Sequence, residues 1–541
     1  MQLMQHTQQE SSNQKIETSP RPTPRLFARA FAALGAGLLA SLLSVVLMGI
    51  LRLAAGIPTP VELFSYHVLK LLSANTFVNL LVKFAPNSKT VPLGLALLGM
   101  IGLGTVLGLL YATVVRGIVP AKEYRPSRRE GLTAAALTVI MTVAAVLLFW
   151  GELGENFLGL PVGWAMLVTS LSLLADFSLY SVTLCLVYRA LLSKQSAPGA
   201  SEATLSRRRL LARAGVATLS LGAAAASFGL VREYLNRYAS YDGLTAYPNN
   251  GMTFPITPNS KHYVVTQNPI DPTPNLDVWR LEIAGLVGTS GSYTYEEVQK
   301  LPSTSRAITL ECIANGVGGG LISTAIWQGV PLHTLLERHR GALPNARYVA
   351  FTSVDGYVVS LPLDEVLAVD ALLAWRMNGS ELPLRHGFPL RVLVPGRYGE
   401  ENPKWLTRVE LTDHFVGGLY SDQGWYNGPL HTTTRIDRPR GHLPLGHAIE
   451  VGGIAFAGAR GISKVEVSVD GGTIWHVATL EPPLSQDAWV LWTWQWLPSL
   501  SGKYTLVARA TDGTGEVQTG HKQITVPNGA TGYHQVTVEV G

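Results

Sequence analysis

The sequence predicts a multi-domain protein with an N-terminal helical transmembrane region, a soluble α+β domain and a C-terminal all-β sandwich. Three observations carry this prediction. The 541 residues are too many for a single domain. The mean hydropathy of +0.21 combines a very apolar first part, residues 26–231, with an ordinary soluble remainder. In the C-terminal part, apolar and polar residues alternate with a period of two, which is typical of strands.

Five apolar runs are long enough to cross a bilayer, which takes about 20 residues. A sixth stretch, residues 61–85, is apolar but carries Glu62, His67, Lys70 and Lys83. It is either a further span or an amphipathic helix at the membrane surface. The five clear runs are residues 26–55, 92–115, 131–150, 161–192 and 210–231.

Basic residues indicate the orientation of these runs. They cluster before the first run, after the second and after the fourth, whereas the loop after Trp150 carries Glu152 and Glu155. Because short cytoplasmic loops are enriched in Lys and Arg, we expect five spans, a cytoplasmic N-terminus and an extracytoplasmic chain after residue 231. The run Ser-Arg-Arg-Arg-Leu-Leu at residues 206–211 is typical of a twin-arginine export signal. A basic flank of an ordinary span has the same appearance.

Short strands and helices are predicted through the soluble half. The first strand, residues 278–287, contains the glycine that ends its alternating pattern. In the C-terminal part, residues 462–475 turn at Asp-Gly-Gly and precede three further strands, which predicts an antiparallel sandwich. The remaining expected elements are a helix at 296–300, a strand at 308–312, a helix at 332–339, and strands at 348–353, 356–361, 490–496, 504–510 and 536–540.

Cys312 is the most informative residue of the soluble half. The other cysteine, Cys185, lies in an apolar membrane-like run, which argues against a disulfide scaffold. Cys312 ends an apolar strand and precedes a glycine turn, residues 316–320, where the backbone can approach a bound group closely. Two interpretations remain open at this point: a thiolate ligand of a soft metal centre, or a buried structural thiol.

Several separate motifs around this cysteine occur in a characteristic order. Together they closely resemble the sulfite oxidase family of molybdopterin-dependent oxidoreductases, from about Tyr263 to the C-terminus, in the form of a membrane-anchored bacterial-type member. The resemblance implies a molybdopterin-binding α+β domain and an immunoglobulin-like dimerisation domain. The motifs are the strand-end cysteine, Trp-Gln-Gly-Val at 327–330, Asn-Gly at 378–379, His-Gly-Phe-Pro-Leu-Arg at 386–391 and Lys-Trp-Leu at 404–406.

The resemblance implies a molybdenum–molybdopterin cofactor and makes Cys312 the protein ligand of the metal. Guanidinium and ammonium groups suit the phosphate of the pterin. Tyr426 falls where the family keeps an active-site tyrosine near the metal, and it is expected to be catalytic together with Cys312. The other expected cofactor-binding residues are Val265, Thr266, Gln267, Asn268, Asp355, His386, Arg391, Asn402 and Lys404.

The chain departs from the sulfite-oxidising members at their substrate-binding arginines. Thr266 and Val317 stand where those members carry arginine, and neither can neutralise an oxyanion. Arg397 is a candidate to supply charge from another direction. We therefore expect oxygen-atom transfer on a small substrate, most simply a sulfur compound, by sulfite oxidation or sulfoxide reduction. The neutral sulfoxide fits a less cationic pocket better.

The expected partners follow from what the sequence contains. His67 is the only histidine between residues 26 and 231, and no Cys-x-x-Cys-His motif occurs, so we expect a separate electron-transfer partner, a cytochrome or a quinone-linked protein. The sandwich predicts a possible homodimer. The modest net charge of +5 and the position of the basic residues beside apolar runs argue against nucleic-acid binding. The alternative is a non-enzymatic membrane-anchored adhesion or assembly protein with a vestigial cofactor site.

These expectations divide the chain into seven segments. They are a cytoplasmic tail (1–25), a transmembrane helical region (26–193), a basic linker (194–209), a membrane anchor or twin-arginine-like signal (210–231), a second linker (232–258), the molybdopterin-binding catalytic domain (259–430) and the immunoglobulin-like domain (431–541).

Overall fold

The structure is a computed structural model that describes residues 24–73, 76, 80, 90–116, 126–154, 162–192, 202–238, 253–266 and 271–541. It divides into two compact units. The first comprises residues 1–44, 101–138 and 178–225, and the second comprises residues 45–100, 139–177 and 226–541.

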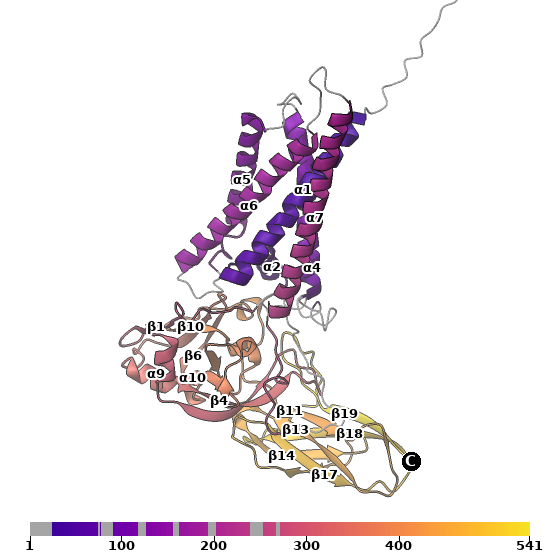
Figure 1. Ribbon diagram of the computed structural model, residues 1–541. Helices are drawn as coiled ribbons and strands as arrows, with labels where there is room; N and C mark the ends of the chain where they lie inside the picture. The colour runs from indigo at the N-terminus through magenta and orange to yellow at the C-terminus, as the bar shows by residue number, and fades with distance from the viewer. Residues whose placement is uncertain are drawn as a thin grey trace, which may run out of the picture. The chain divides into compact units, whose positions relative to one another are not determined.

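The N-terminal half is helical, as predicted (Figure 1). By length and composition, five of the described helices can cross a membrane, within Arg29–Ala55, Val91–Val115, Arg128–Leu148, Gly163–Leu191 and Arg213–Leu235. They confirm the prediction that each of the five apolar runs contains a helix long enough to cross a bilayer. The helices are α1 (Pro24–Ala55), α2 (Pro60–Leu71), α4 (Thr90–Arg116), α5 (Arg128–Leu148), α6 (Val162–Leu192) and α7 (Glu202–Tyr238).

Two of these helices bear on questions that the sequence left open, namely whether residues 61–85 cross the membrane and how the basic motif at 206–211 is structured. Helix α2 covers the start of the stretch 61–85, and its 12 residues are too few to cross a bilayer. Helix α7 begins at Glu202, so the basic motif at 206–211 is helical and continuous with the apolar run that follows it.

In the first unit, small residues bring α1, α4 and α6 close together. A Cβ placed on Gly37 would lie within 3.0 Å of the Thr105 backbone, and Tyr180 donates a hydrogen bond of 2.5 Å to the Gly104 carbonyl. Close approach at glycine is the usual way in which helices associate in a bilayer. An ion pair of 2.7 Å between Arg189 and Glu130 joins α6 to the start of α5.

In the second unit, a buried polar cluster joins α1, α2 and α7. Thr59 and Glu62 form a capping box at the start of α2, with the Glu62 carboxylate 3.1 Å from the Thr59 amide. Arg52 pairs with the same carboxylate at 3.0 Å, and Tyr234 donates to it at 2.6 Å. A charge in an apolar bundle requires such partners.

Residues 271–430 form two sheets, one mixed and one antiparallel. One has the strand order β2-β1-β10-β5-β6, in which β1 and β10 are parallel although more than a hundred residues separate them. The other has the order β3-β4-β7-β8, with β9 paired to β7. The strands are β1 (Leu281–Gly285), β2 (Gly291–Tyr293), β3 (Thr304–Glu311), β4 (Ile322–Pro331), β5 (Tyr348–Ser353), β6 (Val358–Pro362), β7 (Leu372–Met377), β8 (Ser380–Glu381), β9 (Arg391–Leu393) and β10 (Leu406–Thr412).

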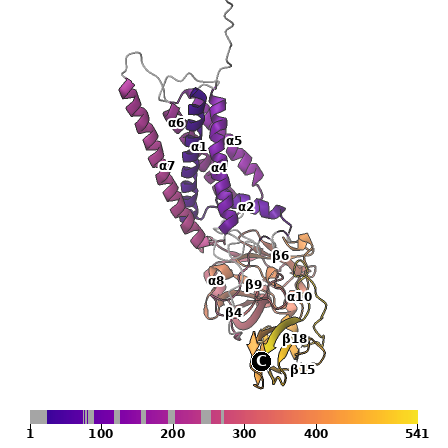
Figure 2. The ribbon, with the colours of Figure 1, turned by 90° about the vertical axis from the view of Figure 1, so that its right-hand side faces the viewer.

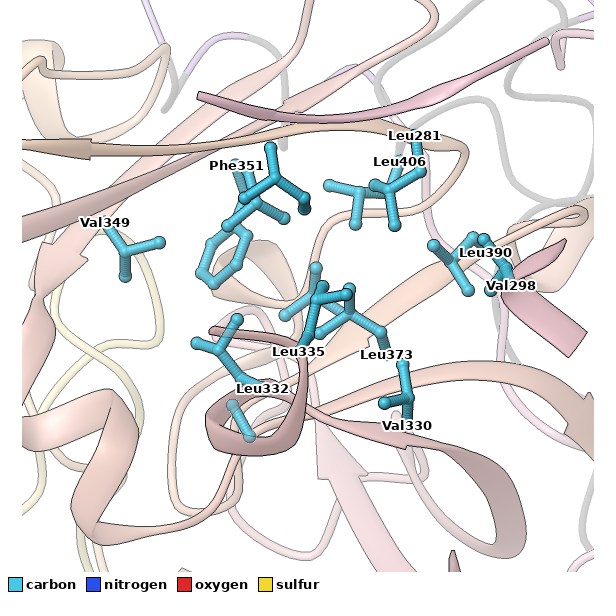
Figure 3. Close-up of a cluster of buried hydrophobic side chains, with 14 of the residues drawn as sticks. Leu281, Val298, Val330, Leu332, Leu335, Val349, Phe351, Leu373, Leu390 and Leu406 are labelled. Atoms are coloured by element: carbon cyan, nitrogen blue, oxygen red, sulfur yellow. The ribbon is translucent and has the colours of Figure 1, made fainter. Parts of the chain in front are cut away.

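The main apolar core of this domain lies between the sheets and their short helices (Figure 3). Leu332 and Leu335 of α9 point into it, among Phe351 of β5, Leu373 of β7 and Leu406 of β10 (Figure 3). Helix α8 is held by a capping box of Thr294 and Glu297. The helices are α8 (Tyr295–Gln299), α9 (Leu332–Arg338) and α10 (Leu363–Ala368), with 3₁₀ turns η1 (Leu384–His386), η2 (Gly399–Glu401) and η3 (Ser421–Gln423).

The C-terminal part is a sandwich of two sheets (Figures 1 and 2). The strand orders are β11-β13-β17-β16 and β12-β19-β18-β14-β15. Trp492, Val465 and Leu506 are fully buried between the sheets. The elements are β11 (Thr433–Arg438), β12 (His442–Leu443), β13 (Ile449–Phe456), η4 (Gly458–Arg460), β14 (Ile462–Ser468), β15 (His476–Val477), β16 (Thr479–Leu480), β17 (Val490–Trp496), β18 (Gly502–Asp512) and β19 (His534–Val540).

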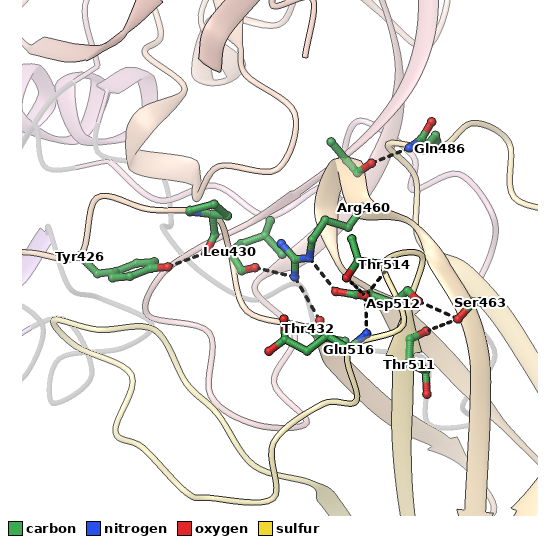
Figure 4. A network of polar contacts seen from close by, with 12 residues as sticks. Tyr426, Leu430, Thr432, Arg460, Ser463, Gln486, Thr511, Asp512, Thr514 and Glu516 are labelled. Atoms are coloured by element: carbon green, nitrogen blue, oxygen red, sulfur yellow. Dashed lines mark hydrogen bonds and ion pairs between the residues drawn. The ribbon is translucent and has the colours of Figure 1, made fainter. Parts of the chain in front are cut away.

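A polar network ties the sandwich to the segment that precedes it (Figure 4). Arg460 pairs with Asp512 at 2.8 Å and donates to the Leu430 carbonyl and to Thr432, each at 3.1 Å. The network thereby fixes the residues just before β11, Leu430 and Thr432, against the sandwich.

Candidate molybdopterin site

The site is built around the end of β3, where Cys312 follows the last strand residue. The Cys312 amide donates to the Leu321 carbonyl at 2.9 Å, and its carbonyl accepts from the Asn315 amide at 2.8 Å. The Asn315 side chain donates to Glu311 and accepts from the Leu321 amide, both at 2.8 Å. Gly318 has φ of +74°, which a side chain would strain. These bonds fold the glycine turn tightly beside the thiol.

The surroundings of Cys312 are those of a buried thiol rather than of a free nucleophile. Only 8% of the residue is exposed. Burial, reinforced by Glu400 and Glu311, raises the pKa of the thiol to about 12. Reactive cysteines need an electropositive setting that lowers the thiol pKa, and here the neighbouring charges are acidic. A metal ion, which displaces the thiol proton directly, is the group that turns such a residue into a thiolate.

Cys312 opens into a large cavity with about 900 Å³ of empty space. Its walls come from the segment before β1, the end of β3, the turn after β5 and the long loop between β9 and β10. The lining residues are His262, Tyr263, Val264, Val265, Thr266, Cys312, Ile313, Ala314, Asp355, Tyr357, Arg385, His386, Arg391, Gly399, Glu400, Asn402, Pro403, Lys404, Trp405, Tyr420 and Trp425.

Cationic side chains gather in one part of this cavity. Arg391 is 7% exposed, and its Nη1 donates to the His386 carbonyl at 3.3 Å. The Lys404 ammonium lies 3.3 Å from the carbonyls of Val265 and Arg385 and 4.4 Å from the centre of the Trp405 ring. Burial, followed by the Arg391 charge, lowers the pKa of His386 to about 3. His386 is therefore a neutral hydrogen-bonding group, and its Nε2 donates to the Asn259 carbonyl at 3.2 Å.

The residues present fit a molybdopterin. Arg391 is buried with no carboxylate partner in the described part of the chain, and its Nε has no hydrogen-bond partner there. Burial lowers the pKa of this guanidinium to about 10. A buried cation held without a counter-charge is unfavourable, and an anionic ligand such as the pterin phosphate would remove that cost. A thiol, a guanidinium, an ammonium and a neutral imidazole thus line the same cavity, and they suit a soft metal and an anionic group.

The structure brings most of the expected residues together. Cys312, Val265, Thr266, Asp355, His386, Arg391, Asn402 and Lys404 all line the cavity. The Asn402 side chain is occupied by the backbone, since it accepts from the Val394 amide and donates to the Tyr398 carbonyl, both at 2.7 Å. Gln267 and Asn268 lie outside the described residues.

Tyr426 is placed differently from the other expected residues. It lines a smaller cavity and not the one into which Cys312 opens. Its hydroxyl donates to the Pro429 carbonyl at 2.9 Å, as Figure 4 shows. Its catalytic role stays a prediction.

His262, Tyr263, Glu400 and Trp425 are among the cavity residues that were not expected from the sequence. His262 packs edge-on against His386, with ring centres 5.0 Å apart. Burial raises the pKa of Tyr263 and of Glu400 well above their usual ranges. The Tyr263 hydroxyl, both Glu400 carboxyl oxygens and the Trp425 Nε1 are buried without a hydrogen bond of ordinary geometry in the described chain. No local motif signals these residues, because each becomes special only through burial.

Comparison with known proteins agrees with this site. Residues 268–420 match the model of the oxidoreductase molybdopterin binding domain, and residues 434–541 match that of the Mo-co oxidoreductase dimerisation domain. Fold and site thus define a molybdopterin-binding oxidoreductase domain joined to a dimerisation domain.

Curated relatives extend the match across both domains. Sulfite oxidase from Gallus gallus is 30% identical over 314 residues, which cover 49% of this chain and 68% of that protein. Mitochondrial sulfite oxidase from Mus musculus is 31% identical over 314 residues, covering 49% and 57%. Inducible nitrate reductase [NADH] 1 from Glycine max is 29% identical over 300 residues, covering 44% of this chain and 34% of the reductase. The chain belongs to the sulfite oxidase family of molybdopterin-dependent oxidoreductases.

The chain therefore spans about a third of the nitrate reductase it matches and about two thirds of the chicken sulfite oxidase. Among solved structures, the sulfane dehydrogenase SoxCD from Paracoccus pantotrophus is similar with 26% identity and a TM-score of 0.45, covering 51% of this chain and 79% of that one.

Proposed function

We propose that the protein is a membrane-anchored molybdenum-cofactor oxidoreductase that transfers an oxygen atom to or from a small sulfur compound. The observation that carries this proposal is a single cavity that holds a deeply buried strand-end thiol, Cys312, together with the uncompensated Arg391 guanidinium. A thiol for the metal and a cation for the phosphate are the two contacts that a molybdopterin needs from a protein.

The residues of the chain would bind and orient the cofactor. Arg391 and Lys404 would hold the phosphate end by charge-assisted hydrogen bonds, and neutral His386 would bond to the pterin. Cys312 would be the protein ligand of the metal. When bound, the molybdenum centre supplies two-electron oxygen-atom transfer, and the protein supplies binding, orientation and electrostatics.

The charges near Cys312 favour a neutral substrate over an oxyanion. The two charged side chains that raise the Cys312 pKa are both carboxyls, Glu400 and Glu311. Arg397 is engaged by carboxylates, since its Nη1 lies 3.2 Å from Glu401 and its Nη2 pairs with Glu365. Among the described residues, neither the two carboxyls beside Cys312 nor the engaged Arg397 offers a free cation to an oxyanion such as sulfite. We therefore favour sulfoxide reduction, in which a sulfoxide, two protons and two electrons give a thioether and water.

Membrane attachment and partners complete the proposal. The five span-length helices anchor the chain, and the basic clusters favour an extracytoplasmic catalytic domain. Residues 206–211 are proposed to act as a twin-arginine export signal. The sandwich, which matches the family's dimerisation domain, supports a homodimer. Electrons would come from a separate cytochrome or quinone-linked protein.

The test compares metal and pterin content in the wild type, Cys312→Ala and Cys185→Ala. The second cysteine lies in a membrane helix and serves as the matched control. We expect about one molybdenum per chain in the wild type and Cys185→Ala, and a marked loss in Cys312→Ala. Turnover of sulfite and of a sulfoxide with artificial electron carriers then separates the two directions. A well-folded wild type without molybdopterin would leave only an anchored, non-enzymatic sandwich protein.

A further inference from the structure

A second, smaller cavity adjoins the one that contains Cys312. It has about 320 Å³ of empty space. Four residues line both cavities and thus form a shared wall: Tyr357, Glu400, Tyr420 and Trp425. This second cavity, which we call the side cavity, is therefore placed to hold part of any molecule that reaches the first cavity at this wall.

The side cavity is acidic. Glu400 and Glu401 line it, and none of its lining residues is lysine, arginine or histidine. Glu401 is 5% exposed; one of its oxygens accepts from Arg397, and the other is buried without a partner among the described residues. Both Glu400 oxygens are buried without a hydrogen bond of ordinary geometry in the described chain. Arg397 is shared with Glu365, so one cation serves two carboxyls, Glu401 and Glu365.

The remaining walls are aromatic. The rings of Tyr420 and Trp425 lie 4.4 Å apart at 44°, and those of Tyr357 and Tyr420 lie 6.1 Å apart, edge to face. Trp425 is 7% exposed, and its Nε1 is buried with no acceptor in the described chain. Aromatic faces beside carboxylates are the setting in which proteins bind alkylated ammonium groups. The indole N–H adds a donor for an oxygen.

We propose that the side cavity binds an alkylated cationic group, so that the substrate carries its reducible oxide next to an ammonium-type centre. This inference rests on the proposed function and names its substrate class. The positive centre would lie against the faces of Tyr420 and Trp425, its charge would favour ionisation of the buried Glu400 carboxyl, and the oxide oxygen would face the shared wall. An oxyanion would meet no lysine, arginine or histidine among the lining residues of the side cavity.

Choline and its carbon isostere, 3,3-dimethylbutan-1-ol, test the proposal on the wild-type protein. The two molecules have the same shape, but choline carries a positively charged nitrogen where the isostere has a neutral carbon. Isothermal titration calorimetry on the full-length, cofactor-loaded protein in detergent should give a dissociation constant at least about tenfold lower for choline. Equal affinities, or no binding of either probe, would overturn the proposal.

Substitutions then assign the binding to this cavity. Glu400→Gln should weaken choline binding at least about tenfold, and Tyr420→Leu should weaken it more than Tyr420→Phe, which keeps the ring. Glu365→Gln is the matched control, because Glu365 also pairs with Arg397 but does not line the cavity; a change below about twofold is expected. Choline binding that is insensitive to Glu400→Gln would refute the assignment.

The outcome is separable from that of the proposed function. Choline binding is measured at equilibrium and requires no turnover, and molybdenum content is determined on the same preparations. A protein that contains no molybdenum but prefers choline over the isostere would contradict the oxidoreductase proposal alone. A loaded enzyme that reduces sulfoxides but shows no preference would contradict the side-cavity proposal alone.

Discussion

The guanidinium of Arg435, on the first strand of the sandwich, donates a hydrogen bond of 2.9 Å to the carbonyl of Gly319, in the turn that follows Cys312. Arg435 is 4% exposed. It also pairs with Asp437 at 2.5 Å and donates to Thr253 at 3.0 Å. The sandwich therefore contributes directly to the shape of the turn beside the thiol.

Arg435→Ala should lower both stability and molybdenum content. Loss of the guanidinium leaves Asp437 buried without its cationic partner, which costs about 3–5 kcal/mol, and it releases the Gly319 carbonyl. The double substitution Arg435→Ala/Asp437→Asn should restore most of the stability, measured by urea unfolding, without restoring molybdenum. Recovery of both together would show that Arg435 acts through stability alone.

Asn315→Ala should loosen the glycine turn. The substitution removes the partners of the Leu321 amide and of Glu311, at a cost of roughly 1–3 kcal/mol. Molybdenum per chain should fall because Cys312 is no longer held in place. Gln518→Ala is a matched control, since the Gln518 amide makes comparable bonds to Thr434 and Gly532 within the sandwich. It should be similarly destabilised yet retain its metal; equal metal loss in both would contradict the assignment.

Arg391→Leu should separate cofactor binding from folding. In the native state burial lowers the guanidinium pKa from 12.5 to about 10, so the charge opposes folding of the cofactor-free protein. We expect apo protein, produced without pterin synthesis, to gain up to about 3 kcal/mol of unfolding free energy, while pterin retention falls sharply. Arg391→Lys should retain an intermediate amount of pterin, because lysine keeps the positive charge but lacks the planar guanidinium that can donate two parallel hydrogen bonds to a phosphate. Full retention in Arg391→Leu would exclude a phosphate contact.

His534 should make the sandwich sensitive to acid. Its Nδ1 accepts from the Ile436 amide at 2.9 Å, and burial, followed by Arg440 and Arg435, lowers its pKa to about 4. Asp437 opposes this shift only weakly.

Between pH 6.5 and 4 the unfolded state binds more protons than the folded state, so stability falls as the pH falls through this window. From pH 7 to 5 the loss is at most about 2 kcal/mol. This loss of stability can be measured by hydrogen exchange of the Ile436 amide, after correction for the pH dependence of the intrinsic exchange rate. His534→Gln should flatten this dependence; an unchanged slope would place its origin elsewhere.

The site residues that were found from the sequence are those with an unusual local setting. Cys312 ends an apolar strand before a glycine turn, and Arg391 is a charge within an apolar strand. Such positions are informative without any knowledge of tertiary contacts. Glu400 and Trp425 lie instead in ordinary loop sequence, where a charged or aromatic residue is usual. Only the fold buries them at the wall between two cavities.

Residue identity alone does not fix how a side chain is used within the fold. Asn402 lines the cavity, as expected, and its side chain also holds the Val394 and Tyr398 backbone, so its contact with the cofactor stays a prediction. Tyr426 hydrogen-bonds to a neighbouring carbonyl. In the membrane half, hydropathy alone was enough to predict the five spans, because length and composition decide whether a helix can cross a bilayer.

The parallel pairing of β1 with β10 sets the order in which the catalytic domain is assembled. Strand β1 remains without this neighbour until Leu406–Thr412 has left the ribosome, and the segment from Arg391 to Lys404 is among the last parts of the domain to be made. Non-local closure of this kind is slow. The cavity can therefore close around a ligand only after synthesis has passed β10.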